Sequence, residues 1–164
     1  MFAPSAEEFE RIALPHAGAA LALARALLGS ESDADDVVQE AYVRAFRYFS
    51  SYQGGEGRAW FLAIVRNAAY AHLQKNGRYA PLDDREVESG PDPETLVLRA
   101  ADASALTQAM AQLPAEFREV LTLRELEELS YKEIADVAAI PLGTVMSRLS
   151  RARALLALKL GGTK

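Results

Sequence analysis

The sequence predicts an all-α protein made of two small helical domains. Apolar residues recur at helical spacing in both halves of the chain, and no convincing run alternates in the manner of a β-strand. Between the halves, residues 77–93 (GRYAPLDDREVESGPDP) hold three prolines and two glycines among mostly acidic charges. Such a segment cannot form one continuous amphipathic helix, so we interpret it as a flexible acidic linker between domains at 1–76 and 94–164.

The composition is that of a soluble, folded protein. The chain has 164 residues and a formal net charge of -5; 50% of its residues are hydrophobic and 25% are charged. It has no cysteine, which excludes a disulfide framework and a thiolate metal site, and only His16 and His72 offer imidazole ligands. We therefore expect no metal and no cofactor.

The N-terminal region lacks the basic start and apolar run of a secretory signal. The most apolar stretch, residues 16–29, is interrupted by Arg25 and is too short to span a bilayer. We expect a cytoplasmic protein without membrane insertion.

In the first half, the helical pattern covers residues 5–28, and Pro15 starts or kinks its second part. Gly29 suits a C-terminal cap, while Ser32 or Asp33 can cap the next helix. That helix is expected to end near residue 48.

A glycine-rich loop, residues 50–57 (SSYQGGEG), precedes a long helix at about 58–76. The apolar stripe of this helix predicts its core side, formed by Trp60, Phe61, Ile64, Val65, Ala68 and Leu73.

In the second half, residues 98–113 and 115–128 read as two helices, the second opened by Pro114. Ser130 and Glu133 form a predicted capping box at the start of a short helix. A turn at 138–141 leads into the last helix, for which Thr144 is the expected N-cap.

The last two helices form a predicted helix-turn-helix whose second helix carries basic but no acidic side chains. At helical spacing its inward face is Val145, Leu149, Ala152 and Leu156, and its outward face is Ser147, Ser150, Arg151 and Ala154. This slim outward face, flanked by Met146 and Arg148, suits a DNA major groove. Alternatively, the arginines only solvate the helix and complement its C-terminal dipole.

The charges are sorted along the chain. Acidic residues crowd the segment 31–40, which contains no base, whereas residues 41–80 carry a single acid, Glu56. The bases of this second segment are Arg44, Arg47, Arg58, Arg66, Lys75 and Arg78. This pattern indicates a second basic surface besides the last helix.

Three motifs carry a resemblance to a known family. Residues 113–156 (LPAEFREV…RARALL) resemble region 4 of the extracytoplasmic-function (ECF) sigma factors, small two-domain subunits of bacterial RNA polymerase. Residues 33–49 and 57–76 resemble their region 2. The resemblance implies a promoter-specificity subunit that binds core RNA polymerase and directs initiation at −35 and −10 promoter elements. It implies a region 2 bundle at 1–76 and a region 4 helix-turn-helix at 94–164.

For the −35 element, the resemblance points to the outward side of the last helix. Ser147 and Arg151 are the expected base-edge readers, and Arg148 and Arg153 are expected on phosphates or in packing. Met146 stands where relatives often have a base. The full set is Thr144, Met146, Ser147, Arg148, Ser150, Arg151 and Arg153.

For the −10 element, the resemblance implies a loop that receives a flipped base and basic residues that hold the exposed strand. Tyr52 is expected to stack on the base, Asn67 to bind its edge, and Trp60 to anchor the loop in the core. Relatives commonly have an aspartate near Ala71 and an arginine near Gln74, which this chain lacks. The expected set is Tyr52, Gly54, Gly55, Arg58, Trp60, Arg66, Asn67 and Lys75.

The resemblance also implies protein partners: the β′ clamp helices and the β flap of core polymerase, and an anti-sigma factor. The expected polymerase-binding residues are Asp35, Asp36, Gln39, Glu40 and Arg44. We find no P-loop, activated nucleophile or paired carboxylates, so no catalytic residue and no enzymatic activity is expected.

Two other interpretations stay open at this level. A stand-alone helix-turn-helix regulator would bind duplex DNA without polymerase, but it does not need the basic segment 41–80. A sigma mimic would only bind an anti-sigma factor, and it does not need Arg151 or that basic segment.

Overall fold

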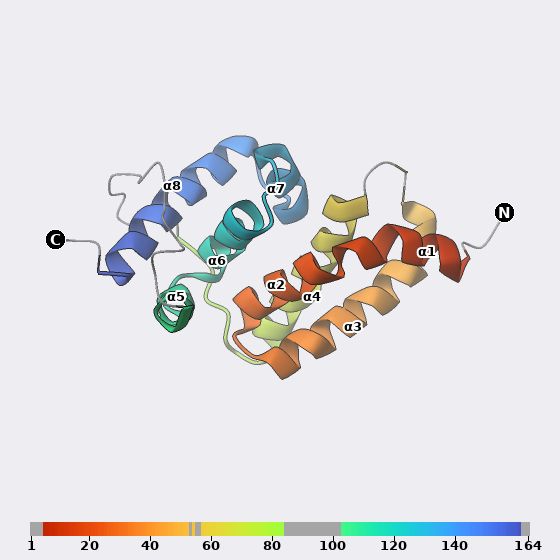
Figure 1. The fold of residues 1–164 in the computed structure, drawn as a ribbon, viewed down its shortest axis with the longest axis horizontal. Helices are drawn as coiled ribbons and strands as arrows, with labels where there is room; N and C mark the ends of the chain where they lie inside the picture. The colour runs from red at the N-terminus through yellow and green to blue at the C-terminus, as the bar shows by residue number, and fades with distance from the viewer. Residues whose placement is uncertain (1–4, 53, 55–56, 84–102, 162–164) are drawn as a thin grey trace.

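The computed structural model describes residues 5–52, 54, 57–83 and 103–161. Within these ranges the regular elements are all helical, which confirms the predicted fold class. An N-terminal bundle (α1 to α4) and a C-terminal bundle (α5 to α8) lie side by side (Figure 1).

The N-terminal bundle begins with a broken helical segment. Helix α1 (Ala6–Ala13) and helix α2 (Ala17–Leu28) are joined by a 3₁₀ turn, η1 (Leu14–His16), which contains Pro15. The break at the proline is as predicted. Two longer helices follow, α3 (Glu31–Arg47) and α4 (Gly57–Lys75), with a 3₁₀ turn η2 (Phe49–Ser51) after α3.

The connection between α2 and α3 partly differs from the prediction. Gly29 is left-handed (φ 70°) and ends α2, as expected. The N-cap of α3 is Ser30, whose hydroxyl accepts a hydrogen bond from the Asp33 amide at 3.3 Å. The prediction of Ser32 or Asp33 was wrong because the chain is already extended at Ser30, directly after the glycine cap.

The C-terminal bundle contains α5 (Ala103–Ala111), α6 (Ala115–Leu121), α7 (Tyr131–Ala138) and α8 (Leu142–Lys159). The start of the helix expected at 98–113 lies outside the described residues. The helix expected at 115–128 is not regular, because a π-helical turn, η4 (Thr122–Leu126), follows α6.

The capping box of α7 is confirmed. The Ser130 hydroxyl accepts a hydrogen bond from the Glu133 amide at 3.1 Å, and the Glu133 carboxylate accepts one from the Ser130 amide at 2.9 Å.

The prediction of Thr144 as the N-cap of α8 was wrong. The helix begins two residues before it, because Pro141 holds the extended conformation of an N-cap (φ -62°, ψ 152°).

The inner stripe of α8 is buried as predicted: Val145, Leu149, Ala152 and Leu156 are each at most 1% exposed. Ala154, expected on the outward face, is also buried at 7% exposure. The buried residues of both bundles form one contiguous hydrophobic cluster. The two bundles therefore share a core rather than touching only at their surfaces.

Three contacts between helical elements join the bundles: α4 packs on α7, and α2 packs on both α6 and η4. The first part of the expected linker, residues 77–83, runs along this junction. The Arg78 guanidinium donates to the Leu28 carbonyl at 3.1 Å, and the Tyr79 hydroxyl donates to the Glu116 carboxylate at 2.7 Å. The rest of that linker lies outside the described residues.

The helical segment Ala6–Leu28 is long and apolar enough to cross a membrane by length and composition alone. The segment reaches this length because α1, η1 and α2 follow one another without a gap. The stretch 16–29 alone is too short. Leu23, Ala24 and Leu27 of the segment are buried in the bundle, and 33% of its apolar window is buried in all.

Gly57 generates a stability prediction, because α4 starts there directly against α1. A Cβ atom at Gly57 would collide with the Ile12 side chain and lie 3.2 Å from the Ile12 carbonyl oxygen. We expect Gly57→Ala to lower the free energy of unfolding by about 1–3 kcal/mol, the usual range for overpacking. Urea denaturation followed by circular dichroism measures this.

The matched control is Gly18→Ala in the same bundle. A Cβ at Gly18 meets nothing within 4 Å, so alanine should raise stability by about 0.5–1 kcal/mol through helix propensity. Equal effects of the two substitutions would contradict the packing described for α1 and α4.

Candidate promoter-binding and polymerase-binding surfaces

The first half of α8 presents its predicted polar face to solvent. Met146 is 53% exposed and Ser147 is exposed beside it. Thr144, Ser150 and Arg151 are half-buried along the same side. The predicted base readers Ser147 and Arg151 are therefore reachable, on a helix whose opposite side is anchored in the core.

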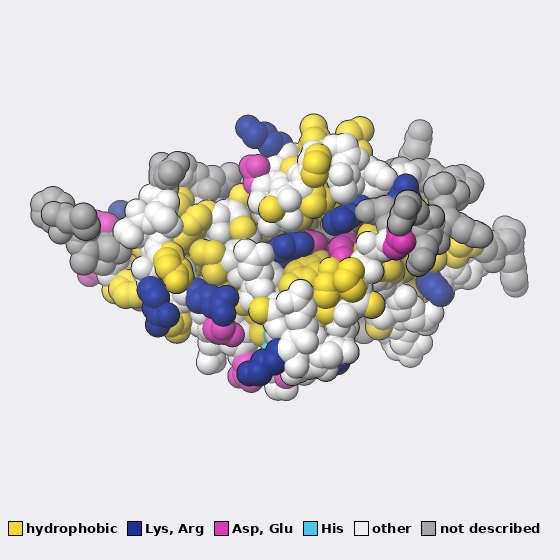
Figure 2. Space-filling view, turned by 180° about the vertical axis from the view of Figure 1, so that it is seen from behind, with side chains coloured by type: hydrophobic (Ala, Val, Ile, Leu, Met, Phe, Trp, Pro, Cys, Tyr) yellow, Lys and Arg dark blue, Asp and Glu magenta, His cyan; other side chains and the backbone are white. Residues whose placement is uncertain are grey.

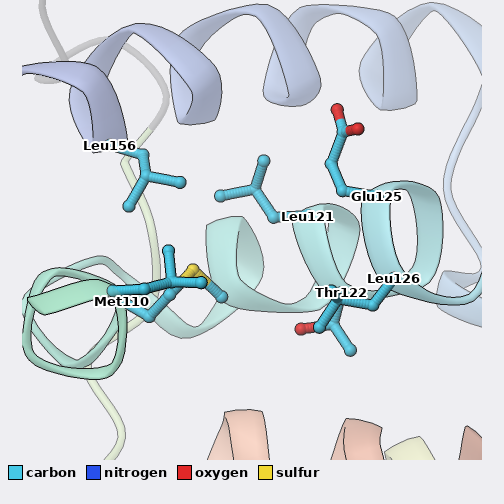
Figure 3. A pocket seen from close by; sticks show the side chains of 7 residues that line it. Met110, Leu121, Thr122, Glu125, Leu126 and Leu156 are labelled. Atoms are coloured by element: carbon cyan, nitrogen blue, oxygen red, sulfur yellow. The ribbon is translucent and has the colours of Figure 1, made fainter. Parts of the chain in front are cut away.

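Arg153 has a different environment from Arg151. Its Nε donates to Glu125 Oε1 at 2.8 Å, and only 12% of its side chain is exposed. Glu125 points toward α8 from η4 (Figure 3). Burial opposes the charged form of Arg153, but hydrogen bonds to Glu125 and Tyr131 and the charge of Glu125 outweigh it and raise the pKa of Arg153. Arg153 thus fastens α8 to η4.

Arg148 lies toward the junction of the two bundles. It is half-buried, and its charge acts on Glu119 of α6 and on Tyr79 of the connecting segment. Of the two arginines expected on phosphates or in packing, Arg153 is in packing, and Arg148 is close enough to Glu119 and Tyr79 for its charge to act on both.

The predicted −10 residues divide into an aromatic cluster and a polar row. Tyr52 is stacked on Phe49 (centroids 5.7 Å apart, planes at 12°) and lies 5.2 Å from Trp60. Trp60 is half-buried against the core, which matches its expected anchoring position. Gly54 is exposed and left-handed (φ 90°), whereas Gly55 lies outside the described residues.

The polar row follows α4, and the C-terminal bundle engages two of its arginines. Arg58 Nη2 lies 2.7 Å from Glu133 Oε2, and Arg66 Nε lies 2.6 Å from Glu119 Oε1. Asn67 accepts a 3.3 Å hydrogen bond from Arg66 Nη1, and Lys75 is exposed. The structure therefore places these four predicted −10 residues on one helix, and two of them, Arg58 and Arg66, have acidic partners.

Glu119 is the centre of this junction. Its side chain is 0% exposed, and it also accepts a hydrogen bond from the Tyr70 hydroxyl at 2.8 Å. The Arg66 guanidinium lies over the Tyr70 ring at 4.3 Å from the centroid. Burial raises the pKa of Glu119, against the opposing effects of Arg66 and Tyr70, and burial together with Glu119 raises the pKa of Tyr70.

Arg118 of α6 and Tyr79 of the segment 77–83 extend the junction. Arg118 donates to the carbonyls of Ala26 (2.7 Å) and Leu27 (2.9 Å), which end α2. Burial and Glu116 raise the pKa of Tyr79 to about 12.

Sequence reasoning missed these junction residues. The one available signal was the pair of acids at 116 and 119, which lie on one face of a helix among apolar residues and therefore require partners from elsewhere.

The expected polymerase-binding residues form one stripe on α3. Asp35, Asp36, Gln39 and Glu40 are exposed. The Arg44 guanidinium pairs with Glu40 at 2.8 Å, one helical turn away. Large apolar side chains continue the stripe, since Val43 is 57% exposed and Phe46 is 44% exposed. Such a mixed surface suits a protein partner.

The charges elsewhere are mixed. On the face turned away from the viewer in Figure 1, basic side chains are scattered, with acidic side chains beside several of them (Figure 2).

A small apolar cavity of about 40 Å³ lies between α5, η4 and α8 (Figure 3). Ligand pockets are usually about 300–1,000 Å³, so this cavity is a packing defect rather than a small-molecule site.

These features define a class: an all-helical protein with a bundle that carries an aromatic and basic row, and a helix-turn-helix whose second helix is exposed on its polar face. Comparison with known proteins identifies it further. Residues 13–79 match the family described as Sigma-70 region 2, and residues 103–156 match Sigma-70, region 4.

Individual relatives agree. The chain is 34% identical over 158 residues to the RNA polymerase sigma-H factor of Pseudomonas aeruginosa, covering 88% of this chain and 82% of the relative. It is 37% identical over 134 residues to the ECF RNA polymerase sigma-E factor of Escherichia coli K12, covering 74% and 70%. The chain belongs to the ECF sigma factors of RNA polymerase, as its motifs predicted, and is a sigma subunit for transcription initiation.

Solved structures give the same fold. The sigma factor RpoE from Bartonella quintana, solved with the anti-sigma factor NepR, has a TM-score of 0.75 and 27% identity, covering 96% of this chain and 99% of that chain. CnrH, solved with the cytosolic domain of CnrY, has a TM-score of 0.67 at 24% identity, which supports the fold alone.

The Arg153–Glu125 pair generates a second prediction. A double-mutant cycle with Arg153→Ala and Glu125→Ala should give a coupling energy of about 1 kcal/mol or more, because both groups are largely buried and in direct contact. Urea denaturation of the four proteins measures it. Additivity within about 0.5 kcal/mol would contradict the structural role of Arg153.

Proposed function

We propose that this sigma subunit reads a −35 element with α8, grips and opens a −10 element with α4 and its preceding loop, and binds core polymerase through α3. The observation that carries this proposal is the order of the three surfaces on a chain whose two halves match sigma regions 2 and 4. The boundaries 1–76, 77–93 and 94–164 are part of the proposal.

At the −35 element, α8 lies in the major groove with Ser147 and Arg151 on base edges. An arginine can donate two hydrogen bonds to guanine, and the small neighbours Ser147 and Ser150 let the helix approach closely. Arg148 binds a phosphate once it is released from the bundle junction. Thr144 and Met146 lie at the end of the helix that enters the groove first.

At the −10 element, the mechanism is physical rather than catalytic. A base leaves the duplex stack and is received beside Tyr52 and Asn67, while Arg58, Arg66 and Lys75 hold phosphates of the exposed strand. Gly54 and Gly55 let the loop adapt to the base. No covalent step is assigned to the chain, so we propose no enzymatic activity for it.

The partners follow from the surfaces. The acidic stripe of α3, with its apolar continuation at Val43 and Phe46, docks on the clamp helices of β′, and the C-terminal bundle docks on the β flap. One similar solved structure, the sigma factor RpoE from Bartonella quintana, is bound to the anti-sigma factor NepR. We therefore propose an anti-sigma partner and, because the polymerase is there, a cytoplasmic location.

In vitro transcription with purified core polymerase tests the function. The protein should form a stable complex with core and direct initiation from promoters in fragments of its host's genome. A protein that binds duplex DNA as a dimer but neither binds core nor initiates transcription would instead support the stand-alone regulator.

Arg151→Ala tests the −35 assignment. Loss of a bidentate contact to guanine should reduce discrimination between cognate and mismatched −35 sequences by about 1–3 kcal/mol, while core binding is unchanged. Competition assays with the assembled holoenzyme on paired promoters measure this. Lys159→Ala removes the same charge from the last turn of α8 and should leave discrimination unchanged; an unchanged promoter preference in Arg151→Ala would overturn the assignment.

A further inference from the structure

A cleft lined by basic and apolar side chains lies beside the small cavity of Figure 3. It has a volume of about 670 Å³, and its lining comes mainly from α2, the segment 77–83, α5, α6 and η4. Three arginines line it, Arg25, Arg78 and Arg118, and none of the lining residues that the structure describes is acidic. Ligand pockets are usually about 300–1,000 Å³, so this cleft has room for a small molecule.

One buried hydroxyl group in the lining has no partner. Thr122 is 0% exposed, and its Oγ1 forms no hydrogen bond with any residue that the structure describes. Thr122 lies on the π-helical turn η4, and its side chain points away from α8, whereas Glu125 points toward that helix (Figure 3). Buried hydroxyl groups are almost always hydrogen-bonded, and π-helical turns are frequent at functional sites. The hydroxyl of Thr122 is therefore a group that a ligand can satisfy.

Arg118 lies four residues before Thr122, about one helical turn away, and also lines the cleft. Its guanidinium donates to three backbone carbonyls, those of Ala26, Leu27 and Leu113. These contacts use three of the five N–H donors of an arginine. Burial lowers the pKa of Arg118, which shows that its charge is not fully compensated by these carbonyls. An anion in the cleft would complete both the donors and the charge.

Other lining residues supply long-range attraction and apolar surface. Arg25 and Arg78 are exposed, so both charges act on a ligand that approaches through water. Arg78 also lies 3.8 Å from Asp33, which compensates part of its charge. Leu106 and Met110 of α5 are half-buried and contribute apolar surface. The cleft thus combines positive charge, an unpaired hydroxyl and an apolar wall.

We propose that this cleft binds a small organic anion with an apolar body. The anionic head, a carboxylate, sulfonate or phosphate, accepts hydrogen bonds from Thr122 Oγ1 and from the remaining donors of Arg118. The aliphatic or aromatic body packs on Leu106 and Met110, and Arg25 attracts the ligand from the rim. The inference goes beyond the proposed function, because neither promoter DNA nor polymerase takes part in it.

A purely structural role accounts for only part of this site. Arg78 and Arg118 donate to the Leu28 and Leu27 carbonyls and so complement the negative C-terminal end of α2. That role does not involve Thr122, whose hydroxyl bonds to no described carbonyl. The structural role and the binding role therefore separate at Thr122, which makes it the position to test.

The test measures binding of anilinonaphthalene sulfonate (ANS), a fluorescent aryl sulfonate, to the full chain. The wild type should bind one ANS molecule per chain with saturation. Thr122→Val keeps the branched shape but removes the hydroxyl, and it should weaken binding at least about 10-fold, the usual loss for a hydrogen bond to a charged group. Because this hydroxyl has no described partner, Thr122→Val should be at least as stable to urea as the wild type.

Arg25→Gln tests the rim, with Arg11→Gln as the matched control. Both arginines are exposed on the N-terminal bundle, but only Arg25 lines the cleft. Arg25→Gln should weaken ANS binding about threefold at low salt and have little effect at high salt, because an exposed charge is screened. Arg11→Gln should bind ANS as the wild type does. Equal binding by the wild type, Thr122→Val and Arg25→Gln would show that the dye lies elsewhere on the surface and would overturn the proposal.

Displacement of ANS shows which kind of body the cleft accepts. Decanoate, below its micellar concentration, carries an aliphatic body, and naphthyl phosphate carries an aromatic one. At least one of them should displace ANS from the wild type, whereas inorganic phosphate should not, because a head alone leaves the apolar wall uncovered. Failure of both organic anions, or equal displacement by uncharged naphthalene, would overturn the proposal. These measurements use the free protein, so their outcome does not depend on whether the chain directs transcription.

Discussion

The burial of one carboxylate, Glu119, sets the arrangement of the two bundles. A fully buried charge is tolerated only with hydrogen-bonding partners, and both of its donors, Arg66 and Tyr70, come from α4. The carboxylate is therefore satisfied only when α6 lies against that helix. Arg118, its neighbour in sequence, bonds to the carbonyls that end α2. The contact of α7 with α4 and the path of residues 77–83 follow from this position of α6.

The sequence predicts what local physics determines. Gly29 and the Ser130–Glu133 capping box act within one helical turn, and the inner stripe of α8 depends only on helical spacing, so each could be read directly. The start of α8 was misplaced because Thr144 is a good cap by residue type, whereas Pro141 holds the required backbone conformation. The π-turn at Thr122–Leu126 and the ion pairs of α4 have no local signature, because their causes lie in the other bundle or in the packing between helices.

Side-chain environment distinguishes arginines that the sequence presents as equivalent. Three arginines within six residues of α8 have three different surroundings. Arg153 is bonded to Glu125 inside the C-terminal bundle, Arg148 is close enough to Glu119 for its charge to act there, and Arg151 lies on the proposed reading face. Counting the arginines of α8 therefore overestimates how many of them are available to bind DNA, because Arg153 is already paired with Glu125. The same holds for α4, where the acids of α6 and α7 neutralise the positive row.

Met146 extends this point, because the side chain that is 53% exposed near the start of α8 is a thioether and not a base. A thioether cannot neutralise a phosphate, so Met146 adds no salt-dependent contact to the proposed reading face of α8. A weak reading helix is sufficient if a second binding domain on the same chain holds it close to DNA, since tethering raises its effective concentration. The net charge of -5 has the same consequence, because it disfavours binding of the free protein to bulk DNA. Under the proposed function, promoter recognition by this chain thus depends on its assembly with polymerase, which supplies the tether.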